Sequence, residues 1–425
     1  MLGKIVKKDV WMLAIDLPAP FPLAFGTLLK LPRVFLILSY QGDRNICRSI
    51  GEASIDFPFA HYDAWDIYSE LVKMPLKGLN ILQRDTILGS STFRASLADF
   101  PASFAALNMA LDDAFGKITK TSVQQIYGCV RSEGIALESM SVASSDPDIV
   151  DKVQKTIEKG RVLKLKGGLG IEEDISRISR VLEILPLDST FAIDFNASYE
   201  IEEIVEILAK LLVKKVMSKI LFLEQPTKQS IGVEGLIEVK KTLDANGMKI
   251  PIMADESFVS LEDALACSLA GILLNFKLQK VGGITRAKEI ESLLGADPHA
   301  SMVGGTFPTA IGRVWDQQGC CVLKTATLPS DAWEPSTDWF TGKKHLIKES
   351  FESNKNMQVA KSGNGSGVTP DWTKIERFRV ENPHAEYLKI RNDLSGERIK
   401  IELRGNTTYS EVYKSLTGLP SDWNI

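Results

Sequence analysis

Five short stretches decide the fold of this chain: VLKLKGG (162–168), AIDFN (192–196), LFLEQP (221–226), PIMADES (251–257) and NFKLQKVGG (275–283). Each combines the apolar residues of a short buried strand with ionisable residues at or just after its end. Between them lie segments with the apolar spacing of amphipathic helices, for example at 172–185, 201–215 and 233–245. The middle of the chain therefore predicts a series of strand–helix units.

The strand–helix units are numerous enough to indicate an architecture. We predict eight strands, at 139–143, 162–166, 191–194, 220–224, 252–255, 272–278, 300–303 and 333–338. Repeated units in this number favour a parallel (β/α)₈-type barrel over an open doubly wound sheet, which usually has fewer strands.

The first part of the chain, up to about residue 135, follows a different pattern. Strand-like runs come first, at 4–17, 34–40 and 46–53. Helix-like stretches follow at 62–74 and 101–119. Strands followed by helices predict a small α+β domain.

The composition excludes several classes of protein. The 425 residues carry a net charge of −4, and no block of Lys or Arg stands out, so we expect no nucleic-acid partner. The five cysteines form no C-x-x-C pair, which is typical of reduced thiols rather than of disulfides or a zinc site. The four histidines lack metal-ligand spacing, and the glycine motifs of nucleotide-binding loops are absent from the sequence.

Apolar runs are too short for a membrane protein. The N-terminus alternates charged and apolar residues, and the apolar stretch 211–223 is interrupted by Lys214, Lys215 and Lys219. These patterns are typical neither of a signal peptide nor of a transmembrane helix. We therefore expect a soluble, cytoplasmic protein without a membrane partner. A homo-oligomer is compatible with the sequence.

Three acidic residues end consecutive predicted strands. Asp194, Glu224 and Asp255 are 30 and 31 residues apart, which is one strand–helix unit each time. Neighbouring parallel strands lie only about 4.8 Å apart, so their ends can direct three carboxylates at one point. Carboxylate oxygens suit Mg²⁺, and a cation would offset their mutual repulsion. The alternative is that each carboxylate caps a helix or pairs with a nearby lysine.

Two lysines flank these acids in strand order. Lys166 ends the strand before Asp194, and Lys277 ends the strand after Asp255. A lysine that lies near other cations and is partly removed from water has a lowered pKa and can act as a base. Bases on opposite sides of a substrate allow a proton to leave from one face of a carbon and to return to the other. The alternative is that Lys277 and Lys280 are solvated loop lysines.

The five stretches, in this order and spacing, resemble the enolase superfamily. GEAS (51–54) and GNGSGV (363–368) extend the resemblance over roughly residues 4–370. The motifs EQP, MADES and N-x-K-x-x-K-x-G-G resemble those of the muconate-lactonizing enzyme subgroup and are nearest to those of its dipeptide epimerases. The resemblance implies a (β/α)₇β-type TIM barrel, an N-terminal α+β capping domain and a C-terminal extension of unknown role. Their boundaries would be 136–339 for the barrel, 1–135 for the capping domain (completed by about 340–374) and 375–425 for the extension.

The resemblance also implies roles for the charged residues. Lys166 and Lys277 would be the acid/base pair, and Lys164 would tune Lys166. The bound cofactor would be Mg²⁺, and its ligands would be Asp194, Glu224 and Asp255.

Substrate-binding residues are implied in the same way. Asn196 and Asp338 would contact the substrate, and a loop from Phe21 to Thr27 would cover it. Dipeptide epimerases usually carry D-x-D at the eighth strand, where the acids hold an ammonium group. Here Ser336-Thr337-Asp338 stands at the matching place, so one acid is missing.

Other departures from the family pattern lie near the same face. The glutamate often found after the seventh strand is absent, because GTFP (305–308) stands there, and Asn196 is followed by Ala197-Ser198 instead of a glycine-containing stretch. His299 lies at the start of the seventh strand, away from the active face, so we interpret it as structural.

These features predict Mg²⁺-dependent abstraction of the proton next to a carboxylate or carbonyl of a small molecule. We favour racemisation or epimerisation of a dipeptide or an acyl amino acid, which would make the protein an isomerase. o-Succinylbenzoate synthesis (a lyase reaction) and cycloisomerisation stay open, since their substrates do not need the missing acid. A non-catalytic, metal-dependent ligand-binding barrel is the alternative of another class, although a binding protein has no need for two opposed lysines.

Overall fold

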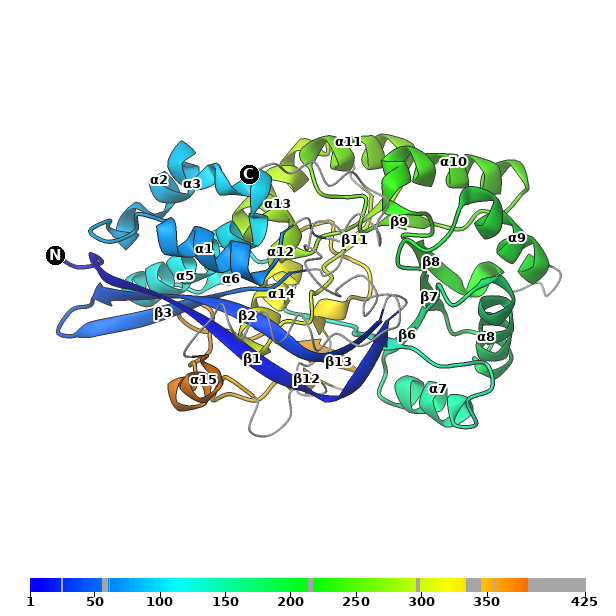
Figure 1. Cartoon of the computed structure of the whole chain (residues 1–425), viewed down its shortest axis with the longest axis horizontal. Coiled ribbons are helices and arrows are strands. Elements are labelled where there is room, and N and C mark those ends of the chain that lie inside the picture. Colours follow the sequence, from blue (N-terminus) through cyan, green and yellow to red (C-terminus); the bar gives the residue numbers. More distant parts are fainter. Residues whose placement is uncertain are drawn as a thin grey trace, which may run out of the picture.

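The computed structural model describes residues 1–23, 26–55, 60, 62–212, 217–295, 299–333, 345–354 and 356–380, with the backbone alone for those of 16–31. Within these ranges the chain forms an N-terminal unit of one sheet with helices and a larger barrel, which lie side by side in Figure 1. No helix in these ranges is both long and apolar enough to cross a membrane.

The N-terminal unit is built on an antiparallel sheet of three strands, β1 (Ile5–Leu23), β2 (Gly26–Gln41) and β3 (Ile46–Ala53). Its helices are α1 (Ala64–Lys73), the 3₁₀ turn η1 (Ile81–Gln83), α2 (Arg84–Gly89), α3 (Ser91–Arg94), α4 (Ser96–Asp99), α5 (Pro101–Thr119) and α6 (Val123–Tyr127). The longest helix, α5, packs closely on β3 at Gly51. A Cβ atom on Gly51 would lie 1.9 Å from the carbonyl oxygen of Ala106, so only glycine fits at this crossing.

The barrel contains seven described parallel strands, each hydrogen-bonded to the next in chain order. They are β5 (Leu137–Met140), β6 (Val162–Lys166), β7 (Phe191–Asp194), β8 (Ile220–Glu224), β9 (Ile252–Ala254), β10 (Leu273–Asn275) and β11 (Ser301–Met302). These strands are nearly all apolar because parallel strands of this kind are buried on both faces.

Helices cover the outer face of the strands, and Figure 1 shows α8 to α11 as an arc around β6 to β9. The helices are α7 (Ile149–Glu158), α8 (Ile171–Ile184), α9 (Ile201–Leu212), α10 (Gly232–Ala245), α11 (Leu261–Ala270), α12 (Leu278–Val281), α13 (Gly283–Leu293) and α14 (Ala310–Val322). The 3₁₀ turns are η2 (Met217–Lys219), η3 (Gln229–Ile231) and η4 (Asp331–Trp333).

The segment 328–332 joins the two edges of the sheet where a regular eighth strand was expected. Leu137 of β5 donates its backbone N–H to the carbonyl of Ser330, and Leu328 donates its N–H to the carbonyl of Ser301 in β11. Ser330 also donates its N–H to the carbonyl of Ile135, and Ala332 donates to that of Val303, so this segment closes the barrel by backbone hydrogen bonds to both neighbours.

The fold class predicted from the sequence is confirmed, with local corrections. The strands predicted at 162–166, 191–194 and 220–224 coincide with β6, β7 and β8. The strand predicted at 272–278 is shorter, because β10 ends at Asn275 and the chain then turns into α12. The strand predicted at 333–338 was wrong at Trp333, which belongs to η4, and 334–338 lie outside the described residues.

Side chains inside the barrel form two layers. We call the lower layer the apolar floor; its fully buried members are Leu137, Ala192, Phe222, Met253 and Met302. Two residues further along β7, β8 and β9 come Asp194, Glu224 and Asp255, on the same face because strand side chains alternate with period two. The strand register aligns Lys166 with Asp194 and Asp194 with Glu224. We call Lys166, Asp194, Glu224 and Asp255 the charged layer, which lies at the carboxyl end of the strands.

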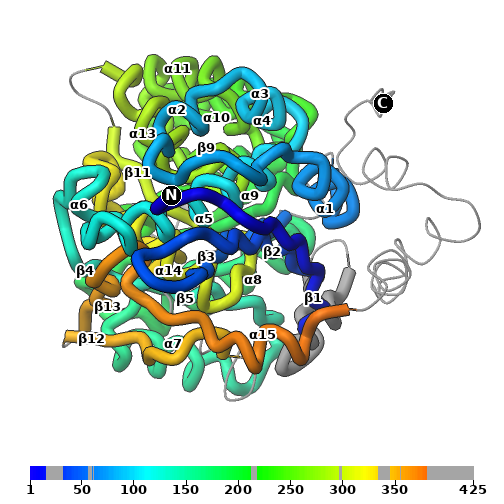
Figure 2. Tube along the Cα trace, turned by 90° about the vertical axis from the view of Figure 1, so that its left-hand side faces the viewer, coloured from blue at the N-terminus to red at the C-terminus, as the bar shows by residue number. Residues whose placement is uncertain are grey.

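The last described segments return to the N-terminal half of the chain. β12 (Glu352–Asn354) and β13 (Met357–Val359) form a small sheet with β4 (Glu133–Gly134). The backbone N–H and hydroxyl of Ser366 donate to Asp113 Oδ1 on α5, at 3.1 and 2.8 Å. Helix α15 (Trp372–Phe378) lies beside β1 and buries Ile375 there (Figure 2). The domain boundaries at 135, 339 and 375 stay predictions, and 381–425 lie outside the described residues.

Candidate active site

Asp194 ends β7 and is held by a lysine and by the turn that follows it. Lys166 Nζ lies 2.5 Å from Asp194 Oδ2, and the backbone N–H of Asn196 donates to Oδ1 at 2.9 Å. The Asn196 side-chain amide also approaches Asp194 and Glu256, at 3.4 Å each. Burial raises the pKa of Asp194, but the ammonium groups of Lys166 and Lys164 outweigh it and hold the pKa below its usual value.

Glu224 ends β8, at the centre of the charged layer, and is completely buried. Its Oε2 accepts a hydrogen bond from Lys164 Nζ at 2.9 Å, and its Oε1 accepts one from the Asn275 amide at 2.7 Å. Burial and the negative charge of Asp194 raise the pKa of Glu224 to about 8, although Lys164 acts in the opposite direction.

Asp255 follows β9 directly and forms ion pairs with two lysines. Lys277 Nζ lies 2.7 Å from Oδ2 of Asp255, and Lys280 Nζ lies 2.8 Å from Oδ1. Burial raises the pKa of Asp255, but both ammonium groups oppose it and lower the pKa below its usual value. The Gln225 side-chain oxygen accepts the N–H groups of Asp255 and Ser257, each at 3.0 Å, and so fixes the turn after β9.

The sequence analysis missed one acid of this site, Asp331. Lys164 is 2% exposed, and its ammonium group lies 2.6 Å from Asp331 Oδ2, 2.9 Å from Glu224 and 3.8 Å from Asp194. Burial lowers the pKa of Lys164, but the three carboxylates prevail and raise it well above its usual value. Asp331 lies in the segment that closes the barrel, so a correct placement of that segment would have identified it.

The three predicted Mg²⁺ ligands meet in the charged layer. As the side chains stand, no group of three or more His, Cys, Asp or Glu residues in the described ranges is arranged so that it could hold a metal ion. The carboxylates pair with lysine ammonium groups instead. The donor set still fits the cation: three buried carboxylates end neighbouring strands, and the negative charge of Asp255 opposes the ionisation of both Asp194 and Glu224. A hard cation would relieve that repulsion.

Some of the predicted residues cannot be placed in the site. Asp338 and Ser336 lie outside the described residues, and the side chains of Phe21 and Thr27 are not among those described. His299 is exposed two residues before β11, at the end of the strand opposite to the charged layer.

The N-terminal unit contacts the barrel through a second buried acid that the sequence analysis did not single out. Glu52 of β3 accepts the N–H groups of Thr309 and Gly312, at 2.9 and 2.8 Å, and the Thr309 hydroxyl at 2.6 Å. Its carboxylate thus satisfies the start of α14, where backbone N–H groups otherwise lack partners. This contact fixes the loop after β11 against β3.

Comparison with known proteins identifies the family. The model of the family described as "Enolase C-terminal domain-like" matches residues 148–374, more than half of the chain. An L-Lys-D/L-Arg epimerase from Desulforapulum autotrophicum is 29% identical over 304 residues, which are 69% of this chain and 80% of that protein. An o-succinylbenzoate synthase from Geobacillus stearothermophilus is 25% identical over 86% of this chain and 93% of that protein.

Solved structures show the same fold. Muconate lactonizing enzyme from Pseudomonas fluorescens, complexed with muconolactone, superposes with a TM-score of 0.78 at 18% identity and covers 89% of this chain and 100% of its own. A dipeptide epimerase from Enterococcus faecalis V583, complexed with Mg and L-Leu-L-Tyr, has a TM-score of 0.73 at 23% identity, over 86% of this chain and 99% of its own. Together with the family match and the charged layer at the strand ends, these similarities show that the chain belongs to the enolase superfamily.

Proposed function

We propose that this protein is a Mg²⁺-dependent enzyme that removes the proton α to a carboxylate or carbonyl, with Lys166 and Lys277 as its acid/base pair. The observation that carries the proposal is the position of these lysines. Lys166 ends β6 and Lys277 follows β10, so β7, β8 and β9 with their three carboxylates lie between them. Each lysine contacts a different outer acid of the set, Asp194 or Asp255.

Asp194, Glu224 and Asp255 would hold the cation. When bound, Mg²⁺ supplies a Lewis acid that orients a substrate carboxylate and stabilises the negative charge of the enolate. Asn275 and Lys164, which hold the two oxygens of Glu224, would keep this carboxylate in place.

The two lysines would move the proton. A carboxylate partner stabilises the charged ammonium form, so a lysine whose acid turns towards a cation gives up its proton more readily. Lys166 would then act from one side of the α-carbon and Lys277 from the other. Lys164, held by Asp331, would stay charged beside Lys166 and favour the neutral form of its neighbour.

For the substrate we propose a dipeptide or an acyl amino acid, which the enzyme would racemise or epimerise. The support is the similarity to the L-Lys-D/L-Arg epimerase, which extends over most of both chains. Asn196 at the charged layer, and Asp338, Phe21 and Thr27 by resemblance, stay the proposed substrate contacts. A lyase reaction of the o-succinylbenzoate type is the second candidate, because that synthase matches a larger share of this chain.

Exchange of the substrate α-hydrogen in deuterated water tests the proposal. The protein would be incubated with a panel of dipeptides and N-acyl amino acids, with Mg²⁺ or with a chelator, and followed by proton NMR and chiral chromatography. We expect exchange and epimerisation that require Mg²⁺. If none of these compounds exchanges its α-hydrogen, but the protein catalyses Mg²⁺-dependent dehydration to o-succinylbenzoate, the lyase reaction replaces epimerisation as the proposed function. If neither exchange nor dehydration is observed, the proposal that the protein is an enzyme of this kind is contradicted.

A further inference from the structure

Arg33 is a buried arginine of the N-terminal unit that the proposed function does not use. It is 1% exposed, and its guanidinium group reaches from β2 to the barrel. Its Nη2 donates to the backbone carbonyls of Thr306 and Phe307, at 2.9 and 2.6 Å, and its Nε also donates to Phe307, at 3.2 Å. Both carbonyls belong to the loop between β11 and α14. Arg33 therefore joins the N-terminal sheet to a loop at the carboxyl end of the barrel strands.

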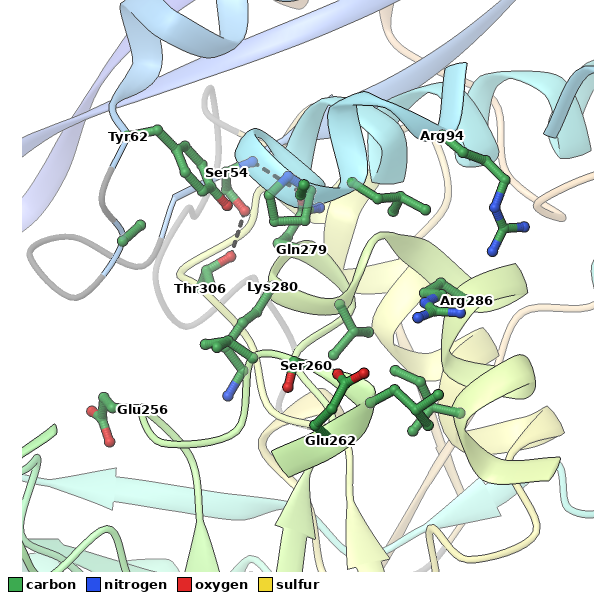
Figure 3. Close-up of a pocket in the computed structure, with 18 of the residues that line it drawn as sticks. Ser54, Tyr62, Arg94, Glu256, Ser260, Glu262, Gln279, Lys280, Arg286 and Thr306 are labelled. Carbon is green, nitrogen blue, oxygen red and sulfur yellow. Dashed lines mark hydrogen bonds between the residues drawn. The ribbon is translucent and has the colours of Figure 1, made fainter. Parts of the chain in front are cut away.

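The backbone of this loop adopts an unusual shape. Phe307 has a φ of +52°, in the left-handed region that bulky residues rarely adopt. Such a conformation persists where the surrounding structure determines it. Arg33 holds the carbonyl of Phe307, and the Ser54 hydroxyl lies 2.5 Å from that of Thr306 (Figure 3). Both of these partners come from the N-terminal unit, so this unit fixes the shape of the loop.

The same loop contacts the charged layer near its start. The Gly304 N–H donates to Asn275 Oδ1 at 2.7 Å, and the Asn275 amide donates to Glu224 Oε1, also at 2.7 Å. A Cβ atom on Gly304 would lie 2.4 Å from Asn275 Oδ1, so a side chain there would push Asn275 aside. Because the Asn275 oxygen is bound to the loop, its NH₂ group faces Glu224, as a carboxylate acceptor requires. The orientation of the Asn275 side chain thus depends on where the loop lies.

We propose that Arg33 is a positioning residue of the active site, which acts through the loop after β11. By holding this loop, Arg33 sets the position of Gly304, which orients Asn275 towards Glu224. The inference deepens the proposed function and rests on it, because Glu224 is the central proposed Mg²⁺ ligand. Partners that orient a metal ligand contribute to metal affinity. A residue of the N-terminal unit therefore helps to set the affinity for Mg²⁺ from a position outside the charged layer.

Calorimetric titration of the full chain with Mg²⁺ tests the inference in Arg33→Lys. This variant keeps a positive charge beside Glu52 but lacks the planar group that reaches both carbonyls of the loop. The matched control is Arg131→Lys, because Arg131 likewise donates to backbone carbonyls, at the opposite end of α14. We expect Mg²⁺ affinity to fall about tenfold in Arg33→Lys, the lower end of the loss for an outer partner of a metal ligand, and to stay unchanged in Arg131→Lys. Wild-type affinity in both variants, or an equal loss in both, overturns the inference.

Hydrogen exchange followed by mass spectrometry tests the loop itself, without metal or substrate. Peptides that cover 301–309 should exchange faster in Arg33→Lys than in wild type, because the Gly304 N–H loses its fixed acceptor, and they should be unchanged in Arg131→Lys. Unchanged exchange in Arg33→Lys overturns the inference even if Mg²⁺ affinity falls. If the wild-type chain binds no Mg²⁺, the metal site of the proposed function is contradicted. Faster loop exchange would then show a structural role of Arg33 alone, which overturns the inference as well.

A double variant locates the effect of Arg33 at the contact between Gly304 and Asn275. Gly304→Ala should weaken Mg²⁺ binding by itself, because the added Cβ displaces Asn275. Its combination with Arg33→Lys should weaken binding little further, since both changes act on one contact. Losses that multiply in the double variant place the effect of Arg33 elsewhere and overturn the inference.

A second pair of variants serves if Arg33→Lys does not fold. Arg33→Met combined with Glu52→Gln removes both buried charges together, so that neither is left unpaired. Glu52→Gln alone is the reference for this variant. We expect the added loss of Arg33 to lower Mg²⁺ affinity again by about tenfold. Equal Mg²⁺ affinity in the two variants overturns the inference.

Discussion

The apolar floor and the charged layer lie two residues apart on the same strands, yet their energetics are opposite. Phe222 and Met253 in the floor are fully buried among apolar neighbours, where burial itself is stabilising. Glu224 and Asp255 are buried to the same extent, but each needs lysines and hydrogen bonds to offset the loss of hydration. The barrel therefore gains stability in one layer and concentrates reactive, unfavourably buried charge in the next, as functional sites commonly do.

Truncation in the floor should give the largest effect, and it should be an effect on stability. Phe222→Ala removes a fully buried ring and should lower the free energy of unfolding by about 3–5 kcal/mol. The control is Leu187→Ala, at a side chain that is 94% exposed, which should change it by less than about 0.5 kcal/mol. Denaturant unfolding measures both. Equal losses in the two variants would contradict the role of the floor.

A change in the charged layer two residues away should act on function instead. Glu224→Gln keeps the shape but removes the central carboxylate, so Mg²⁺ affinity or Mg²⁺-dependent turnover should fall by at least about 10–100-fold. Glu238→Gln on the exposed face of α10 is the matched control and should change neither. Calorimetric Mg²⁺ titration and the exchange assay are the measurements. Wild-type affinity and turnover in Glu224→Gln would remove Glu224 from the metal site.

The acid found only in the structure should have a smaller effect. Asp331→Asn takes away the closest carboxylate of Lys164, so kcat/KM should fall about tenfold, the size expected from one hydrogen bond to a charged group. Asp338→Asn is the informative comparison, because the sequence analysis assigned the substrate-binding acid to that position. If Asp338→Asn lowers kcat/KM more than Asp331→Asn does, Asp338, the acid that the family resemblance places at the eighth strand, is the functionally more important one.

The smallest effect concerns stability and pH. The pKa of Glu224 is raised to about 8 in the folded chain, so between about pH 4.5 and 8 the folded state keeps a proton that the unfolded state has lost. Wild-type stability should therefore fall with rising pH across this window, without divalent cation. Glu224→Gln lacks this contribution, so its stability relative to wild type should rise from pH 5 to pH 8. Thermal unfolding from pH 5 to 8 measures the difference, and a constant difference would contradict the raised pKa.

Much of the barrel could be predicted from the sequence because its strands are short and apolar on both faces. Strands β7 and β8 begin and end where the apolar runs FAID and ILFLE do. The charged layer could be predicted from the same strand ends, since carboxylates at the ends of neighbouring parallel strands lie beside one another. The segment at 328–332 was not predicted because it contains Pro329 and pairs with the first strand of the barrel only through an isolated bridge at Ser330, so it carries no strand pattern.

The ion-pair partners of the charged side chains could not be predicted from the sequence. The spacing of Lys164 and Lys166 places both on one face of β6, but it does not say that the first reaches Asp331 and Glu224 while the second reaches Asp194. These contacts depend on long-range packing between residues up to 167 positions apart. The contact of Glu52 with the start of α14 likewise depends on how the N-terminal unit meets the barrel, which no local pattern encodes.

The central claim is that Lys166 and Lys277 act on opposite faces of one α-carbon, and single-lysine variants test it most directly. Lys166→Ala and Lys277→Ala would each be incubated with both epimers of the substrate in deuterated water with Mg²⁺. Each variant should lose about 10²–10⁴-fold in epimerisation, the usual contribution of a positioned acid or base. Each should still exchange the α-hydrogen of the one epimer whose hydrogen faces the remaining lysine. Equal exchange of both epimers by either variant would contradict the two-lysine account.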